Sequence, residues 1–193
     1  MTSYVINRDD RPERLRNVTE EFKKVNINPR VFHAIIGKPG WIGCAKSHIA
    51  VIEECRNERY FQIFEDDVVF SKDFGTVGEL AISQLPSNWD CLYYGVSPLE
   101  PQIKYSDNLF RVNHAYCTHA ILWNNRPNGA IEFILNNKDK IRKYDVFLAE
   151  QIQPRFNCFV TYPLIATQRQ YKSDTCTRSD VSVILHNFER FCK

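Results

Sequence analysis

The sequence contains no long apolar run, no strong net charge and no closely spaced cysteine pair. No segment approaches the ~18 apolar residues that a membrane span needs, and the apolar stretch before Arg8 is too short for a secretory signal. A net charge of +2 creates no global field that would attract nucleic acid or an anionic membrane. We therefore expect a cytoplasmic protein with no membrane span and no nucleic-acid partner.

The seven cysteines are odd in number and contain no C-x-x-C spacing. Both features argue against a zinc site and against a disulfide framework. The simpler interpretation is a set of buried or incidental thiols in a reducing compartment. Hydrophobic residues make up 44% of the 193 positions and charged residues 25%, which suits one globular domain with a sizeable core.

Short β-favouring runs alternate with helical patterns as far as about Gly95. This alternation predicts an α/β fold with a mostly parallel sheet flanked by helices. A capping box formed by Asp10 and Glu13 is expected to start the first helix. The other expected elements in this half are strands at Tyr4–Ile6, Val31–Ile36, Tyr60–Phe64 and Asp90–Gly95, and helices at Ala45–Arg56 and Phe74–Leu85.

Beyond Gly95 the pattern is less regular. Ile103–Tyr105 and Leu109–Val112 flank a turn and predict a hairpin, and Tyr116–Trp123 predicts another strand. Short helices are expected at Gly129–Leu135 and Val146–Gln153, followed by a last helix starting near Ser179.

Three consecutive acids, Glu65, Asp66 and Asp67, interrupt an apolar segment. Unpaired buried carboxylates are costly, so the triplet needs a reason. In an extended chain Glu65 and Asp67 point the same way and Asp66 points opposite. Such a pair at a strand's carboxyl end suits a divalent cation whose shell a diphosphate completes. On the triplet alone, a surface turn or a helix cap is an equal alternative.

Two further segments are candidates for anion binding. Arg11 and Arg14 follow the first strand and could contact phosphate, or they could pair with acids on their own helix. Ser47 and His48 open the second helix after a glycine loop, where a helix N-terminus favours anions. The loop is not a P-loop, and the two side chains could instead cap or pack.

Three later residues carry polar groups in places that need explanation. His119 lies in an apolar strand. Asp145 precedes an apolar helix and is a candidate general base, although helix capping explains it equally well. Asp174 follows a polar loop, and an ordinary turn explains it as well.

Taken in order, several segments resemble glycosyltransferase family 25, which includes bacterial lipooligosaccharide galactosyltransferases and collagen hydroxylysine galactosyltransferases. The resemblance spans roughly residues 4–174. Its matching segments are Tyr4–Asn7, Arg11–Leu15, Gly43–His48, Phe64–Val68, Trp89-Asp90 with Tyr94-Gly95, Ala115–Ala120, Tyr144-Asp145, and Gln168 with Ser173-Asp174. The chain departs from the family pattern at Arg8 and at Lys143, and it is short for the family.

The resemblance implies a GT-A fold, in which a Rossmann-like nucleotide-binding sheet joins a smaller antiparallel acceptor-side region. We expect a single domain over residues 1–193, with a nucleotide-sugar-binding half at 1–97 and an acceptor-side half at 98–193. The family also implies a UDP-sugar donor, a divalent metal (usually Mn²⁺, with Mg²⁺ possible) and inversion at the anomeric carbon. Galactose or glucose would pass to a hydroxyl on a glycan, a lipooligosaccharide or other glycolipid, or a hydroxylysine peptide.

The resemblance also implies roles for individual residues. The expected metal ligands are Glu65, Asp67 and Asp174, and the expected donor contacts are Asn7, Arg11, Arg14, Ser47 and His48. Asp66 lies beside the donor sugar or is structural. Asp145 is the first choice for the catalytic base and His119 the second.

Two other classes of protein fit the same sequence. A transferase-like fold can lose catalysis and bind a nucleotide or a glycan. A nucleotidyltransferase also uses paired acids and a metal, but it consumes a nucleoside triphosphate.

Overall fold

The computed structural model describes residues 1–169, 171 and 191. At its centre lies an eight-stranded sheet in which β10 and β8 run opposite to the other strands, so the sheet is mostly parallel, as predicted. Across the sheet the strands are β2 (Arg30–His33), β1 (Thr2–Asn7), β3 (Tyr60–Glu65), β10 (Ala120–Asn124), β5 (Cys91–Tyr93), β11 (Cys158–Thr161), β8 (Leu109–Arg111) and β7 (Ile103–Lys104).

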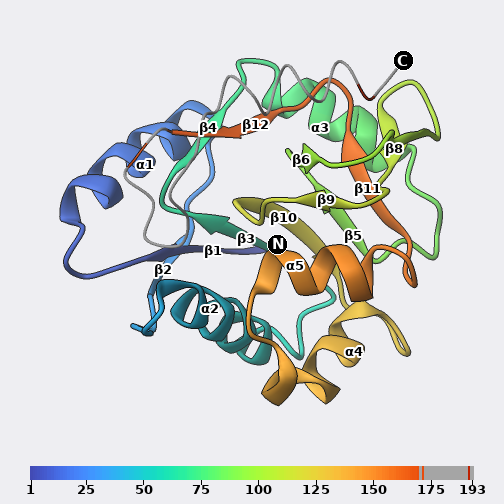
Figure 1. Ribbon diagram of the computed structural model, residues 1–193. Coiled ribbons are helices and arrows are strands. Elements are labelled where there is room, and N and C mark those ends of the chain that lie inside the picture. Colours follow the sequence, from blue (N-terminus) through green and yellow to red (C-terminus); the bar gives the residue numbers. More distant parts are fainter. Residues whose placement is uncertain (170, 172–190, 192–193) are drawn as a thin grey trace.

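Helices cover both faces of this sheet (Figure 1). On one face lie α1 (Pro12–Lys24) and α3 (Phe74–Ser83). On the other lie α2 (Gly40–Glu54), α4 (Ala130–Asn136) and α5 (Tyr144–Phe147), the last continued by a π-helical turn at Leu148–Ile152. The result is a three-layer α/β arrangement in which both faces of the sheet are buried.

Strand β3 shows why the central strands carry almost no polar alternation. Ile63 belongs to the core beneath α2, whereas its neighbour Phe64 belongs to the core beneath α1, where its ring lies 5.2 Å from that of Phe22. Both side chains are fully buried. A strand covered on both faces is apolar at nearly every position, which explains the pattern that predicted it. The exception, Gln62, is buried and donates a hydrogen bond to the Tyr94 hydroxyl at 2.7 Å.

The start of α1 differs from the prediction. Its N-cap residue is Arg11, no side chain caps the helix, and Pro12 takes the first helical position. Asp10, the expected cap, instead accepts two hydrogen bonds from the Arg8 guanidinium, at 2.9 and 2.8 Å. The capping-box prediction is therefore wrong, because a bidentate ion pair with Arg8 occupies the carboxylate.

The strand predicted at Tyr116–Trp123 is two strands. β9 (Ala115–Tyr116) pairs with β6 (Ser97–Pro98), and β10 begins only at Ala120. Between them Cys117 has a φ of 84°, a left-handed conformation that ends the first strand. His119 therefore lies between strands, where its carbonyl accepts a hydrogen bond from the Glu65 N–H at 2.9 Å.

Other boundaries move by a few residues. The hairpin prediction is confirmed by the antiparallel pair β7–β8. Helix α2 begins at Gly40, five residues before the predicted start, and α5 begins at Tyr144, so Asp145 lies within its first turn instead of ahead of it. The helix expected from Ser179 lies outside the described residues.

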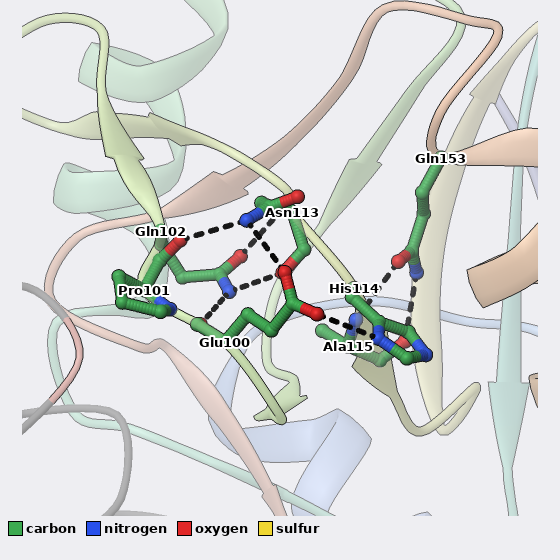
Figure 2. A network of polar contacts seen from close by, with 7 residues as sticks. All are labelled: Glu100, Pro101, Gln102, Asn113, His114, Ala115 and Gln153. Carbon is green, nitrogen blue, oxygen red and sulfur yellow. Dashed lines mark hydrogen bonds and ion pairs between the residues drawn. The ribbon is translucent and has the colours of Figure 1, made fainter.

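A network of amide side chains holds the antiparallel part together (Figure 2). The side chain of Gln153 accepts a hydrogen bond from the Ala115 N–H and donates one to the Ala115 carbonyl, both at 2.8 Å. Gln102 makes the same kind of two-way contact with the backbone of Asn113. These side chains replace strand partners that the short β9 ribbon does not provide.

Two further observations concern membrane-spanning helices and the cysteine side chains. Within the described residues, no helix combines the length and the apolar character that a membrane crossing needs. The described cysteines are free thiols: Cys44, Cys55, Cys91, Cys117 and Cys158.

Candidate active site

The acidic triplet lies where the sequence predicts, at the carboxyl end of a buried strand. Glu65 is the last residue of β3, Asp66 and Asp67 form a turn, and the chain continues into β4 (Val68–Phe70). β4 pairs with β12 (Ala166–Gln168), and this ribbon brings Gln168 back beside the triplet. The edge formed by the ends of β1 and β3 is the usual ligand position in an open α/β sheet.

Glu65 is held by two neighbours. Its Oε1 atom accepts a hydrogen bond from Thr118 Oγ1 at 2.5 Å and lies 3.0 Å from His48 Nε2. Burial raises the pKa of Glu65, but the contact and charge of His48, the Thr118 hydroxyl and the charge of His119 outweigh it and hold the pKa below its ordinary value. Glu65 therefore remains ionised and is 23% exposed.

The pKa of Asp67 is shifted in the opposite direction to that of Glu65. Burial is the main cause that raises its pKa well above the ordinary value, and the charges of Glu65 and Asp66 add to it. Its Oδ2 atom accepts a hydrogen bond from Gln168 Nε2 at 3.2 Å. Its Oδ1 atom is buried and has no hydrogen-bond partner among the described residues. A buried carboxylate oxygen without a protein partner is unusual, and this oxygen is available to a cation or to water.

Asp66 faces a different neighbour from the other two acids. Its carboxylate lies 3.4 Å from the guanidinium of Arg14 on α1, and both side chains are nearly buried. The same guanidinium lies over the ring of Tyr171, 4.6 Å from the ring centre. Glu65 thus contacts α2 and Asp66 contacts α1, in agreement with the alternation expected for an extended chain.

The glycine loop is fixed against α2. Because this helix begins at Gly40, Ser47 and His48 lie well inside it, and the prediction that they open the helix is wrong. The Ser47 hydroxyl donates to the Gly43 carbonyl and accepts from the Ile35 N–H, both at 2.8 Å. A Cβ at Gly43 would collide with the Ile35 carbonyl and the backbone of Gly37, so only glycine fits there. Ser47 is fully buried, and its observed contacts position the helix.

His48 stands between this helix and α5. Its ring is 1% exposed and stacks on Tyr144, with ring centres 4.5 Å apart and an interplanar angle of 19°. Cys44 lies one helical turn earlier and presents its thiol on the same side. The ligand atoms of Cys44, His48 and Glu65 all lie within 4.8 Å of one another.

The two candidate bases differ in access. His119 is completely buried, and burial lowers the pKa of its imidazole against the raising effects of the Glu65 charge and the Ala166 carbonyl. Asp145 is partly exposed, and its Oδ1 atom accepts a hydrogen bond from the Val146 N–H at 2.8 Å. The charge of Asp145 acts on the Cys44 thiol together with that of Glu65, so Asp145 faces the same edge.

Of the remaining predicted residues, Asn7 and Arg11 belong to the described part of the chain. Asn7 ends β1, where its Nδ2 donates to the Arg8 carbonyl at 2.7 Å and its Oδ1 is buried without a partner among the described residues. Arg11 is the partly exposed N-cap residue of α1. Asp174 lies outside the described residues.

Sequence reasoning missed two residues that contact the acids. Thr118 was part of the family-like segment but was not singled out, although its hydroxyl is bound to Glu65. Gln168 bridges Asp67 and Cys117, since its Nε2 donates to Asp67 and its Oε1 lies 3.5 Å from the Cys117 sulfur. The only signal for either residue is that it belongs to a segment that resembles the family.

The fold and its acidic edge define a GT-A-type α/β protein. Among solved structures, a glycosyltransferase involved in glycosylation of the major capsid of PBCV-1 has a similar fold, with a TM-score of 0.53 and 11% identity. The match covers 82% of this chain and 79% of that one. At this identity the likeness concerns the fold alone.

The chain belongs to glycosyltransferase family 25. The family described as "Glycosyltransferase family 25 (LPS biosynthesis protein)" matches residues 39–187. A "Procollagen lysyl hydroxylase and glycosyltransferase" of Acanthamoeba polyphaga mimivirus is 27% identical to the chain. That match covers 63% of this chain but only 18% of the viral protein, so the chain corresponds to a small part of this relative.

Proposed function

We propose that the protein is a metal-dependent, inverting hexosyltransferase that moves galactose or glucose from a UDP-sugar to an acceptor hydroxyl. The acceptor class is a glycan, a glycolipid such as lipooligosaccharide, or a hydroxylysine peptide. Family membership supports the transfer of a sugar. The observation that carries the metal-dependent form is the unpartnered Oδ1 of Asp67 beside the ionised carboxylate of Glu65.

The donor atoms at this edge fit a hard divalent cation. Mn²⁺ and Mg²⁺ prefer carboxylate oxygens and accept phosphate oxygens in the remaining positions. Asp67 supplies an unused oxygen, and Glu65 supplies a carboxylate that is partly exposed. When bound, the cation would offset the negative charge that develops on the departing nucleotide. Asp174 stays a proposed third ligand.

Basic residues from α1 suit the donor phosphates. Arg14 is anchored by Asp66, so its guanidinium is oriented before any ligand arrives. Arg11 lies at the N-cap of the same helix, where backbone N–H groups also favour anions. Asn7, at the end of β1, has a buried amide oxygen without a partner among the described residues that could accept a hydrogen bond from the donor.

Asp145 is the better candidate for the base that takes the acceptor proton. A base must approach within about 3 Å of the acceptor hydroxyl. Asp145 is partly exposed, whereas the side chain of His119 is completely buried. Burial also lowers the pKa of His119, which favours its neutral form. We assign His119, like His48, to the support of Glu65.

A donor screen tests the proposal directly. The purified chain is incubated with UDP-galactose, UDP-glucose and other UDP-sugars, and UDP release is measured with Mn²⁺, with Mg²⁺ and after EDTA treatment. Manganese-dependent release from a UDP-hexose is expected, rising when a hydroxyl acceptor is added. Donor binding without release would instead favour a non-catalytic module, and consumption of a nucleoside triphosphate would favour a nucleotidyltransferase.

A further inference from the structure

Three side chains of mixed chemistry meet between the middle of α2 and the end of β3. Cys44 and His48 are four residues apart on this helix, and Glu65 ends the adjacent part of β3. A thiol, an imidazole nitrogen and a carboxylate oxygen lie within 4.8 Å of one another there. Cys44 and Glu65 are partly exposed, so an ion can reach them from solvent.

This donor set differs from the one expected for the transfer reaction. Hard cations such as Mn²⁺ favour oxygen ligands, whereas sulfur and imidazole together favour Zn²⁺ and Co²⁺. Zinc sites with three protein ligands leave a fourth position open for water or for a substrate group. Cysteine spacing along the sequence could not reveal this cluster, because only one of its ligands is a cysteine.

The ring of His48 is already fixed in place. It stacks on Tyr144, and its Nε2 atom points at Glu65 from 3.0 Å. The helix places Cys44 one turn away on the same side, so no large rearrangement is needed to bring three ligands around one ion. Oriented ligands reduce the entropic cost of binding.

We propose that Cys44, His48 and Glu65 form a second metal site, selective for thiophilic divalent ions such as Zn²⁺. Binding replaces the S–H bond of Cys44 with a sulfur–metal bond and releases that proton to water. The His48–Glu65 hydrogen bond gives way to two metal bonds. His48 also releases its Nε2 proton to water, and the imidazole, now neutral, keeps its remaining proton on Nδ1.

The site has a consequence for the transfer reaction, and this part rests on the proposed function. Glu65 is shared between the thiophilic site and the oxygen-ligand pair that it forms with Asp67. An ion held by Cys44 and His48 therefore withdraws Glu65 from the manganese site. Zn²⁺ is expected to inhibit manganese-dependent transfer by competing for this one carboxylate.

Cobalt spectroscopy tests the site without any donor or acceptor. The metal-free protein is titrated with Co²⁺, and a thiolate-to-cobalt charge-transfer band is expected in the near ultraviolet and is lost when Zn²⁺ is added. Cys44→Ser should abolish the band. Cys117→Ser is the matched control, because Cys117 also lies near Glu65 and Asp67 but outside the cluster, and it should retain the band.

The cobalt titration can succeed or fail whether or not the protein transfers a sugar. Absence of the band in the unmodified protein, its persistence in Cys44→Ser or its loss in Cys117→Ser overturns the site. Circular dichroism establishes whether each variant is folded. If Cys44→Ser is unfolded, Cys44→Ala is used in its place. Should transfer be detected, Cys44→Ser should raise the Zn²⁺ concentration for half-inhibition at least tenfold, the lower end of the roughly 10–100-fold cost of losing even an outer-shell partner. An unchanged value overturns the competition.

Discussion

Two polar regions of this molecule satisfy their hydrogen bonds in different ways. In the amide network of Figure 2, the side chains of Gln102 and Gln153 each donate and accept hydrogen bonds. No buried side-chain nitrogen or oxygen of the residues drawn there lacks a hydrogen-bond partner. At the edge of β1 and β3, buried polar atoms of Asn7, His48 and Asp67 lack partners among the described residues.

Under the proposed function, the contrast distinguishes polar groups that stabilise the fold from polar groups that would bind the donor and its metal. Neutral amides that satisfy each other and the backbone contribute to stability and leave nothing to bind. Carboxylates packed together do the reverse, because the charges of Glu65 and Asp66 help to raise the pKa of Asp67. Substitutions in the two regions should therefore affect different measurements.

The largest effect is expected at Asp145. Asp145→Asn keeps the shape of the side chain but removes its basicity, and loss of a general base costs about 10²–10⁴-fold in rate. kcat should fall by this amount while donor affinity, measured by calorimetry, is unchanged. Asp139→Asn, an exposed acid in the preceding turn, is the control and should retain full activity. Full kcat in Asp145→Asn would rule this residue out as the base.

Asp67→Asn should reduce turnover by about 10²–10³-fold, a typical cost for removing one group that stabilises transition-state charge. The fold should not suffer, since the amide relieves the repulsion from Glu65 and Asp66. Mn²⁺ titration of UDP release, together with a thermal melt, measures both properties. A clear drop in melting temperature with unchanged turnover would place Asp67 with the structural groups.

Gln153→Ala tests the amide network. It leaves the N–H and the carbonyl of Ala115 without their side-chain partner. Burying such groups unsatisfied costs about 1–3 kcal/mol each, so the free energy of unfolding in urea should fall by at least this amount. Activity per folded molecule should stay the same. Lost turnover at full stability would mean that the network belongs to the active site.

The smallest effect is expected at the rim of the network. Glu100 is paired with His114, at 3.4 Å, but both side chains are substantially exposed. Glu100→Gln should change the free energy of unfolding by less than about 1 kcal/mol, the usual range for exposed ion pairs. A urea titration beside Gln153→Ala makes the comparison direct, and equal losses would contradict the distinction between the buried amides and the exposed pair.

The regular elements could be predicted because their patterns are local. The mostly apolar run of β3 reflects burial on both faces, and the hairpin β7–β8 follows from turn residues between two short strands. The predicted boundaries were wrong where one side-chain contact or one backbone conformation overrode the pattern. Asp10 pairs with Arg8 instead of capping α1, and the left-handed Cys117 divides one predicted strand into two.

The site could be predicted only as separate pieces. Asp66 lies beside Arg14 and not beside the partners of Glu65, as expected, although it belongs to the turn after β3. Nothing in the sequence shows that His48 and Thr118, from distant segments, converge on the same oxygen of Glu65. Such contacts depend on strand order, which local patterns do not encode. The sequence alone leaves His119 and Asp145 as two candidates for the base. The structure adds that His119 is buried and that Asp145 is partly exposed.

The reversed strand β10 has a consequence for how the site can change. Because β10 is antiparallel to β3, with Ala120 opposite Phe64, the residues that precede it arrive where β3 ends. Thr118 reaches Glu65 in this way without a dedicated loop. Positions 65 and 118 are joined by a direct hydrogen bond, so the effect on stability of substituting both should differ from the sum of the two single effects.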